Sequence, residues 1–308
     1  MDCPWLCVNG FGGHIKSTRT TLIIQKKNSV EEFPLSAISN LLIAGGHTIN
    51  SATIVHLIRH GAFITFFEAN GTPVGIIKPF GDKTDLKIMK AQREIPRHRF
   101  ATEIAKASIK SRLVAIAGMQ SQTGNDLYYD GEEQFLHKSL EEIDFLIKLE
   151  EVERLNRLVA DMYYEIMARC ISPELCYRRR AVLHQQDPIN ALLSFGYSLL
   201  FGNCCIPTVG ERLDPDCGVA SEEPGSLINA MIEPLKASMI DVPVFMYARE
   251  SLHCSDFEIF QDRCIVSDPV ISTITKRFQC TIDDKKIEEQ VRNFKDSMLE
   301  NSDIRVQY

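Results

Sequence analysis

The feature that most constrains the fold of this 308-residue chain is a change in hydrophobic pattern near residue 80. Before it, short runs rich in β-branched and aromatic residues (WLCVNGF, TTLIIQKK, AFITFFEA) are bounded by Gly, Asn and Ser, as strands usually are. After Pro79-Phe80-Gly81, most of the chain repeats its apolar residues with helical spacing. We therefore predict an α+β protein with a β-rich N-terminal domain over residues 1–85 and a larger all-α domain over residues 86–308.

Two local signals refine the N-terminal domain. Asn70-Gly71 separates FITFFEA from TPVGIIK, and this dipeptide between apolar runs is the strongest short hairpin signal in the chain. Before it, NSATIVHLIRHG predicts one amphipathic helix with Leu57 on its apolar face and Gly61 as its stop.

Apolar spacing and polar stretches divide the helical region into separate predicted segments. RFATEIAKASIKSRLVAIAGM predicts one long helix, and the polar residues 122–134 predict a surface loop. LEEIDFLIKLEEVERLNRLVADMYYEIMARC keeps helical periodicity for about thirty residues. SLINAMIEPLKASMI predicts a helix capped by Ser226, and residues 283–299 predict a charged amphipathic helix.

Composition and charge exclude some classes of protein. The net charge is −7, whereas a plain basic DNA-binding domain is strongly positive. Basic residues nevertheless gather between Lys78 and Arg112 and at Arg178, Arg179 and Arg180, so a local basic face is compatible with an acidic whole.

The sequence predicts no membrane segment. No run reaches roughly 18 consecutive apolar residues, the length needed to cross a bilayer. The first residues, MDCPWLCVNGFGG, lack the charged stretch and apolar run of a secretory signal. We therefore expect a cytoplasmic protein without a membrane partner.

The ten cysteines include no CxxC pair and show no zinc-site spacing. In a reducing compartment such residues are most simply small buried apolar side chains. A disulfide, or a zinc or iron–sulfur role, is the alternative.

The string DPINALLSFGYSLL, which begins at Asp187, is unusual. It predicts a capped and nearly all-apolar helix, therefore buried, that carries one polar face made of Asn190, Ser194 and Ser198. Taken alone, the string describes a core helix whose small polar groups bond locally.

Together with other segments, this string resembles the CRISPR-associated protein 1 family, the integrase of CRISPR spacer acquisition. The matching segments follow one another in the family's order and spacing over nearly the whole chain. They are VNGFGGHIKSTRTTLIIQKK, FPLSAISNLLIAGGHTINSATIVHLIRHGAFITFFEANGTPVGIIKPFG, DPINALLSFGYSLL, RLDPDCG and SLINAMIEPLKASMIDVPVF.

The resemblance implies a β-rich N-terminal domain that builds a homodimer and a helical domain that carries the active site. Family members hold a divalent metal, Mg²⁺ or Mn²⁺, with a Glu, a His and an Asp. The metal helps a free DNA 3′-hydroxyl attack a phosphodiester of the CRISPR repeat. They work with CRISPR-associated protein 2.

Each of these three positions is changed here. The family Glu precedes a tyrosine-aromatic pair by seven residues, and counting back from Tyr163 gives Asn156. The family His follows an Asp-Pro…Gly element, and its position is filled by Ser221. The family Asp lies in the helix that begins with Ser226, and its position is filled by Ala230.

An amide, a hydroxyl and a methyl group leave too little negative charge to hold a catalytic cation. We therefore expect a catalytically degenerate member of the family with no bound metal and no other cofactor. The alternatives are a misplaced register at Asn156, or a rebuilt site that uses nearby acids, for which the candidates are Glu153, Glu222, Glu223 and Glu233.

Three functions stay open from the sequence. The chain is a DNA-binding or architectural homodimer in spacer acquisition, an active metal-dependent nuclease or integrase with a displaced acidic site, or a protein-binding subunit without a nucleic-acid role. The first implies branched or fork-like DNA, CRISPR-associated protein 2 and an active paralogue as partners. The basic residues available for DNA phosphates, each of which could instead be a solvated surface charge, are Lys87, Lys90, Arg93, Arg97, Arg99, Lys106, Lys110, Arg112, Arg178, Arg179 and Arg180.

Overall fold

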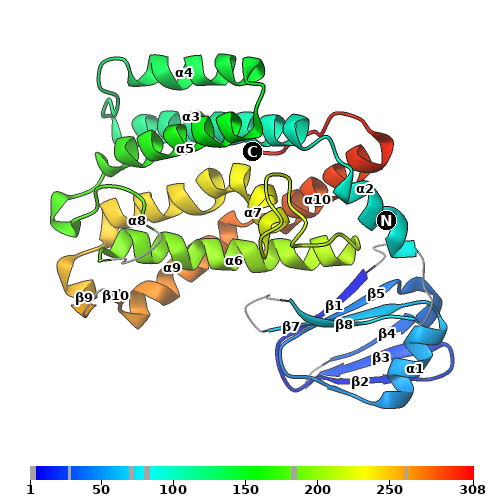
Figure 1. Ribbon diagram of the computed structural model, residues 1–308. Coiled ribbons are helices and arrows are strands. Elements are labelled where there is room, and N and C mark those ends of the chain that lie inside the picture. Colours follow the sequence, from blue (N-terminus) through cyan, green and yellow to red (C-terminus); the bar gives the residue numbers. More distant parts are fainter. Residues whose placement is uncertain (1–4, 27–28, 69–72, 80–83, 182–185, 261–262) are drawn as a thin grey trace. The chain divides into compact units, whose positions relative to one another are not determined.

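The computed structural model describes residues 5–26, 29–68, 73–79, 84–181, 186–260 and 263–308. The chain forms two compact units, one of residues 1–94 with 201–215 and one of residues 95–200 with 216–308. The first unit holds β1 to β8 and the second is mostly helical (Figure 1), which confirms the predicted α+β class. The expected domain boundary between residues 85 and 86 stays a prediction, since compact grouping does not show which segments fold independently.

The first unit contains two four-stranded sheets. One has the order β1-β5-β7-β8, with β1, β5 and β7 parallel and β8 antiparallel to β7. The other has the order β4-β3-β2-β6. The strands are β1 (Trp5–Asn9), β2 (His14–Ser17), β3 (Thr21–Lys26), β4 (Ser29–Pro34), β5 (Asn40–Ala44), β6 (Thr48–Ile49), β7 (Phe63–Phe67) and β8 (Pro73–Ile77).

The predicted helix before β7 is confirmed as α1 (Ser51–Arg59). Its N-terminus is capped by Asn50, whose side chain accepts a hydrogen bond from the backbone N–H of Thr53 at 2.7 Å. Gly61 follows with φ +79°, a left-handed conformation that glycine adopts at little cost. The residues of β7 and β8 pair as the hairpin prediction requires, while Asn70 and Gly71 themselves lie outside the described residues.

The segment 201–215 belongs to the first unit through side chains that bond its backbone. The buried side-chain amide of Asn40 donates to the carbonyl of Val209 at 3.1 Å. Gln92, also buried, donates to the carbonyl of Asp214 at 2.8 Å and accepts from its N–H at 3.0 Å. Such bonds satisfy backbone groups that irregular structure would otherwise leave unpaired.

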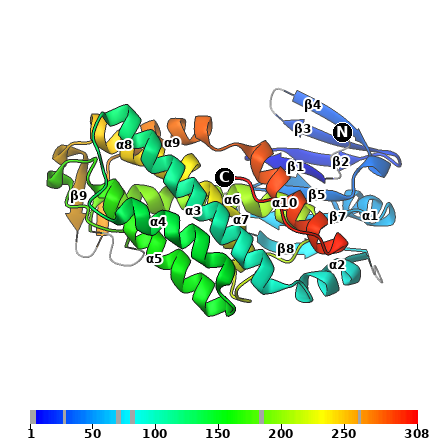
Figure 2. The same ribbon diagram turned by 90° about the horizontal axis from the view of Figure 1, so that it is seen from above.

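Helices dominate the rest of the chain (Figures 1 and 2). A small antiparallel pair, β9 (Phe257–Phe260) and β10 (Arg263–Val266), follows α8. The remaining helices are α2 (Thr84–Arg93), α3 (Arg97–Thr123), α4 (Glu132–Glu142), α5 (Leu149–Ala168), α6 (Pro188–Gly210), α7 (Ser226–Ile232), α8 (Val242–Ser251), α9 (Asp268–Thr281) and α10 (Asp284–Glu300).

The stretch of about thirty residues with helical periodicity does not form one helix, because the chain breaks between α4 and α5. After a 3₁₀ turn at Ile143–Phe145, Leu146 is extended with ψ 131°. Lys148 is extended as well, and its N–H donates to the carboxylate of Glu151 at 3.2 Å. That capping box starts a new helix inside a stretch whose apolar spacing runs on unbroken.

The expected cap at Ser226 is also wrong. Gly225, with φ +70°, precedes the first helical residue, and the Ser226 hydroxyl donates to the carbonyl of Asp216 at 2.8 Å. Further along, Pro234 lacks the N–H that an α-helix needs. The helix therefore passes through a 3₁₀ turn (Glu233–Leu235) and a π turn (Ala237–Asp241) before α8 begins.

Helix α6 has the apolar composition predicted, but only half of its most apolar stretch is buried inside the protein. By length and composition alone it is also long and apolar enough to cross a membrane.

We predict that Asn40→Ala destabilises the first unit by about 1 kcal/mol, because a buried bond to the carbonyl of Val209 is lost, while that carbonyl keeps the N–H of Arg212 as a donor. Urea unfolding monitored by circular dichroism measures this change. Asn125→Ala, at an exposed position after α3, is the matched control and should leave the transition in place. An equal effect of both substitutions would contradict the assignment.

Candidate functional site

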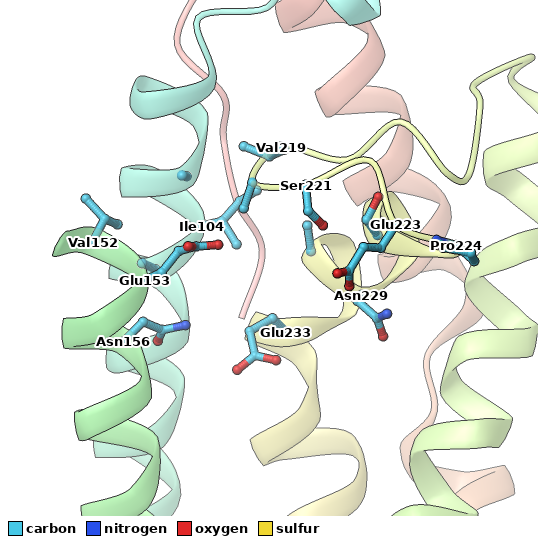
Figure 3. A pocket seen from close by; sticks show the side chains of 15 residues that line it. Ile104, Val152, Glu153, Asn156, Val219, Ser221, Glu223, Pro224, Asn229 and Glu233 are labelled. Atoms are coloured by element: carbon cyan, nitrogen blue, oxygen red, sulfur yellow. The ribbon is translucent and has the colours of Figure 1, made fainter. Parts of the chain in front are cut away.

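The three positions that carry metal ligands in the resembled family converge on one pocket in the second unit. Asn156 comes from α5, Ser221 from the loop before α7, and Ala230 from α7. The pocket has a volume of about 330 Å³. Figure 3 shows Glu153 and Asn156 directed from α5 toward the elements that carry Ser221 and Glu233.

The pocket wall is mixed, with seven polar and eight apolar residues among the fifteen that line it. Besides Asn156 and Ser221, the polar residues are three carboxylates, one hydroxyl and one amide, from Glu153, Glu223, Glu233, Ser226 and Asn229. The apolar lining comes from α3, α5, α7 and the loop before α7, as Ala101, Ile104, Ala105, Val152, Val219, Ala220 and Pro224, together with Ala230.

The position of Ser221 is fixed by a tightly bonded loop. The N–H of Gly218 donates to the carbonyl of Ser221 at 3.0 Å, and the carboxylate of Asp216 accepts from the N–H of Gly225 at 2.7 Å. A Cβ at Gly218 would lie 2.5 Å from the hydroxyl oxygen of Ser226 and 2.8 Å from the carbonyl oxygen of Ser221. Only glycine therefore allows this close approach.

A buried guanidinium joins the helices beneath the pocket. Arg112 of α3, 4% exposed, donates to the side-chain oxygen of Asn156 at 2.8 Å and to one carboxylate oxygen of Glu233 at 2.5 Å. Lys236 donates to the other oxygen of Glu233 at 2.6 Å. The single carboxylate kept from the family's Asp-bearing helix is therefore neutralised by two cations.

The pKa of Glu233 reflects these contacts. Burial alone would raise it, but the charges of Lys236 and Arg112 outweigh burial and lower the pKa from 4.5 to about 2. Glu233 is consequently ionised at neutral pH, with both of its oxygens already bonded.

A second carboxylate, Asp241, lies in the same buried region but does not line the pocket. It accepts a hydrogen bond from the hydroxyl of Tyr197 at 2.5 Å, and the hydroxyl oxygens of Tyr197 and Tyr164 are 2.6 Å apart. Burial raises the pKa of Asp241 to about 6, against the lowering effects of Tyr197 and Arg112.

The residues present do not fit a divalent metal ion at the family's position. The side-chain oxygen of Asn156 already accepts from Arg112, Ala230 offers no donor atom, and both oxygens of Glu233 are bonded to cations. Mg²⁺ requires several oxygen ligands in near-ideal octahedral geometry. Across the described part of the chain, no group of three or more His, Cys, Asp or Glu side chains is placed to hold a metal.

The structure separates the acids named as substitutes. Glu153 and Glu223 line the pocket, whereas Glu222 does not and pairs with Arg97 at 2.5 Å. Glu153 lies on α5 and Glu223 lies in the loop before α7. Glu233, the other carboxylate of the pocket, forms ion pairs with Arg112 and Lys236.

The basic residues named for DNA contacts have different surroundings. Arg178, Arg179 and Lys110 are exposed. Lys106 pairs with Glu103 and Asp144. Arg99 donates to the carbonyl of Ser302 at 2.9 Å.

Two of the candidate arginines form hydrogen bonds within the protein. Arg112 is buried, so it is not available to a phosphate. Arg180 donates to Asn190 and Ser194 at 2.9 Å each, which explains the polar face of α6. The pairing of Arg112 with Asn156 and Glu233 joins residues 44 and 121 positions apart, so no local spacing in the sequence signals it.

Comparison with known proteins settles the family. The model of the CRISPR-associated protein Cas1 family matches residues 6–280. The chain belongs to the Cas1 family. A relative from Methanospirillum hungatei, CRISPR-associated endonuclease Cas1 2, is 36% identical over 285 residues, which cover 92% of this chain and 94% of the relative. The resemblance seen in the sequence motifs is confirmed, and with it membership of the integrase family of CRISPR adaptation.

Solved structures share the fold at low identity. A casposase bound to an integration product has a TM-score of 0.80 and 18% identity, covering 98% of this chain and 97% of the casposase. A partial Cas6-RT-Cas1–Cas2 complex has a TM-score of 0.73 and 16% identity, with 98% and 97% coverage.

We predict that Glu233 makes the stability of the folded protein depend on pH. Its native pKa of about 2 lies below its ordinary 4.5, so its contribution to stability is complete above pH 4.5 and is lost as the pH falls toward 2. Glu233→Gln should flatten the decline in stability across that window. It should also cost about 3 kcal/mol at pH 7, because Arg112 would lose its charged partner.

Urea unfolding at pH 7, 4 and 3 measures both effects. Glu153→Gln, at an exposed carboxylate of the same pocket, is the control and should keep the wild-type dependence. A Glu233→Gln variant with an unchanged slope would show that the ion pairs contribute nothing.

Proposed function

We propose that this Cas1-family chain is catalytically inactive and acts in spacer acquisition as a DNA-binding or architectural homodimer. One observation carries the proposal: Asn156, Ser221 and Ala230 meet in a single pocket. The framework that would place three metal ligands together is intact, while the donor atoms needed for the metal are missing.

The electrostatics of the pocket support inactivity. Strand transfer adds negative charge around a phosphodiester that is already an anion, and a metal ion ordinarily stabilises that charge. Here Arg112 and Lys236 are paired with Glu233, and Glu153 and Glu223 add negative charge to the wall. Without a metal, these two carboxylates repel a phosphate rather than stabilise it.

Exposed cations elsewhere support a role in binding DNA. Arg178 and Arg179 are exposed beside Arg180, whose bonds to α6 hold the segment in place. Because such contacts act on the phosphate backbone, they need no metal and no sequence recognition. The casposase of the same fold is bound to an integration product, and we extend this behaviour to branched or fork-like DNA for the present chain.

The exposed edge of the first sheet supports assembly with a second copy of the chain. β8 is an edge strand, and its neighbouring outward side chains Val74 and Ile76 are 63% and 50% exposed. An open edge with apolar side chains suits pairing with a second copy. The Cas1–Cas2 complex of the same fold suggests Cas2 as a further partner. An active Cas1 paralogue would supply the chemistry, and the assembly would work in the cytoplasm.

An integration assay with Mn²⁺ tests the catalytic claim. The wild-type chain alone should join no DNA ends above background, because its pocket lacks metal ligands. The added presence of an active Cas1 paralogue should allow joining. Strand transfer by the wild-type chain alone would contradict the proposal, and its loss in Glu153→Gln/Glu223→Gln would then identify a displaced active site. Lys138→Ala is a control that leaves the pocket untouched.

A binding assay tests the role in DNA binding. Affinity for fork DNA should fall steeply with salt, and Arg178→Ala/Arg179→Ala should weaken it about tenfold and reduce the salt slope. Lys138→Ala/Lys276→Ala removes the same charge from exposed positions on α4 and α9 and should have a much smaller effect. Absence of salt-dependent binding by the wild type would favour a purely protein-binding subunit.

A further inference from the structure

Two exposed cysteines from distant parts of the sequence share one hydrogen-bond acceptor. The Sγ atoms of Cys176 and Cys254 lie 3.6 and 3.8 Å from the same carbonyl oxygen, that of Glu174. Both cysteines are exposed and free. The shared acceptor places the two sulfur atoms no more than 7.4 Å apart, although 78 positions separate the residues in the chain.

The two thiols come from turns that follow different helices. Cys176 ends the 3₁₀ turn Pro173–Leu175, which comes after α5. Cys254 begins the turn Cys254–Asp256, which comes after α8. Figures 1 and 2 both place these two connections at the same end of the helical unit.

The backbone at Cys176 adopts a conformation that is uncommon for a cysteine. This residue has φ +56°, in the left-handed region where helix-terminating positions favour glycine or asparagine. A cysteine has no backbone advantage there. An uncommon residue at a strained position, beside a second thiol, is the pattern of a site used for chemistry.

The sequence led us to expect cysteines with small buried side chains. Among the nine described cysteines, this holds for four, while Cys7 and Cys264 are half-buried and Cys176, Cys254 and Cys280 are exposed. The four buried cysteines are Cys170, Cys204, Cys205 and Cys217. Burial raises the pKa of Cys170 to about 11 and that of Cys204 to about 12, so neither supplies a thiolate at neutral pH.

We propose that Cys176 and Cys254 are a redox modification site, which forms a reversible disulfide by exchange with a low-molecular-weight disulfide such as glutathione disulfide. The thiolate of one cysteine attacks a sulfur of the small disulfide and releases one small thiol. The second cysteine then attacks the mixed disulfide and releases the other small thiol. The two protein thiols are oxidised, the small disulfide is reduced to two thiols, and their protons pass to the released thiolates.

To form the bond, the two sulfur atoms must approach to about 2.05 Å. Exposed side chains change rotamer within nanoseconds, which lets the two thiols sample this approach. Once formed, it joins the turn before Arg178 and Arg179 to the end of α8. The covalent loop would contain α6, α7 and α8, so oxidation restricts the unfolded chain and raises resistance to unfolding.

Peptide mapping by mass spectrometry tests the site directly. The intact protein is incubated with glutathione disulfide, alkylated and digested without reduction. We expect one cross-linked peptide pair containing Cys176 and Cys254, a protein mass lower by about 2 Da, and reversal by dithiothreitol. The oxidised wild type should melt several degrees above the reduced form.

Matched variants complete the experiment. Cys176→Ser and Cys254→Ser should each lose the cross-link and the thermal shift, and should carry glutathione on the remaining cysteine. Cys280→Ser, at an exposed cysteine of α9, should keep both. Glutathione attached separately to Cys176 and Cys254 in the wild type, without a cross-link over the full range of glutathione disulfide, would overturn the proposal. A cross-link without a thermal shift in the wild type would overturn its structural consequence.

Discussion

The candidate site depends above all on the buried guanidinium of Arg112. It reaches from α3 to Asn156 on α5 and to Glu233 after α7, and so contacts all three helices that surround the pocket. An unpaired charge at this depth would be costly, so each partner restricts where the others can lie. Lys236 completes the arrangement from the opposite side of Glu233. The geometry of the pocket is therefore maintained by ion pairs and does not require a bound metal.

This arrangement shows that the backbone around the pocket is held by contacts away from the positions of Ser221 and Ala230. Ser221 is placed by a loop that depends on Gly218 and Asp216, and Ala230 is placed by α7. Neither position is held by the side chain that occupies it. Substitution at these positions removes donor atoms without disturbing the backbone, because the forces that set the backbone act elsewhere.

Much of the architecture could be predicted from local pattern. The strands of the first unit, α1 with its Asn50 cap and the apolar α6 follow from apolar spacing and capping residues. The break at Lys148 could not be predicted in this way, because the apolar spacing continues through it and a single capping contact decides the outcome. The N-cap of α7 is Gly225 because the Ser226 hydroxyl bonds to the carbonyl of Asp216 instead of to the helix. That contact depends on the tertiary fold, so local sequence could not predict it.

The site was less accessible to sequence reasoning than the fold. Motif spacing indicated Asn156, Ser221 and Ala230, and the structure gathers them into one pocket. Spacing could not reveal that Arg112 is buried beneath them or that Glu222 turns away toward Arg97, because both depend on contacts between residues more than 100 positions apart. The nearness of the Cys176 and Cys254 thiols to one carbonyl was hidden as well, because the two residues lie 78 positions apart in the chain.

The polar face of α6 has a consequence for how such proteins are classified. Asn190 donates to the carbonyl of Arg179 and accepts from the N–H of Ala181, so it holds the incoming backbone in place. The string around it contributed to the family resemblance, yet it makes no contribution to the pocket lining. A sequence signature of this kind reflects contacts that stabilise the fold. Searches built on it therefore group proteins by a shared scaffold, while the residues that line the pocket carry the information about its chemistry.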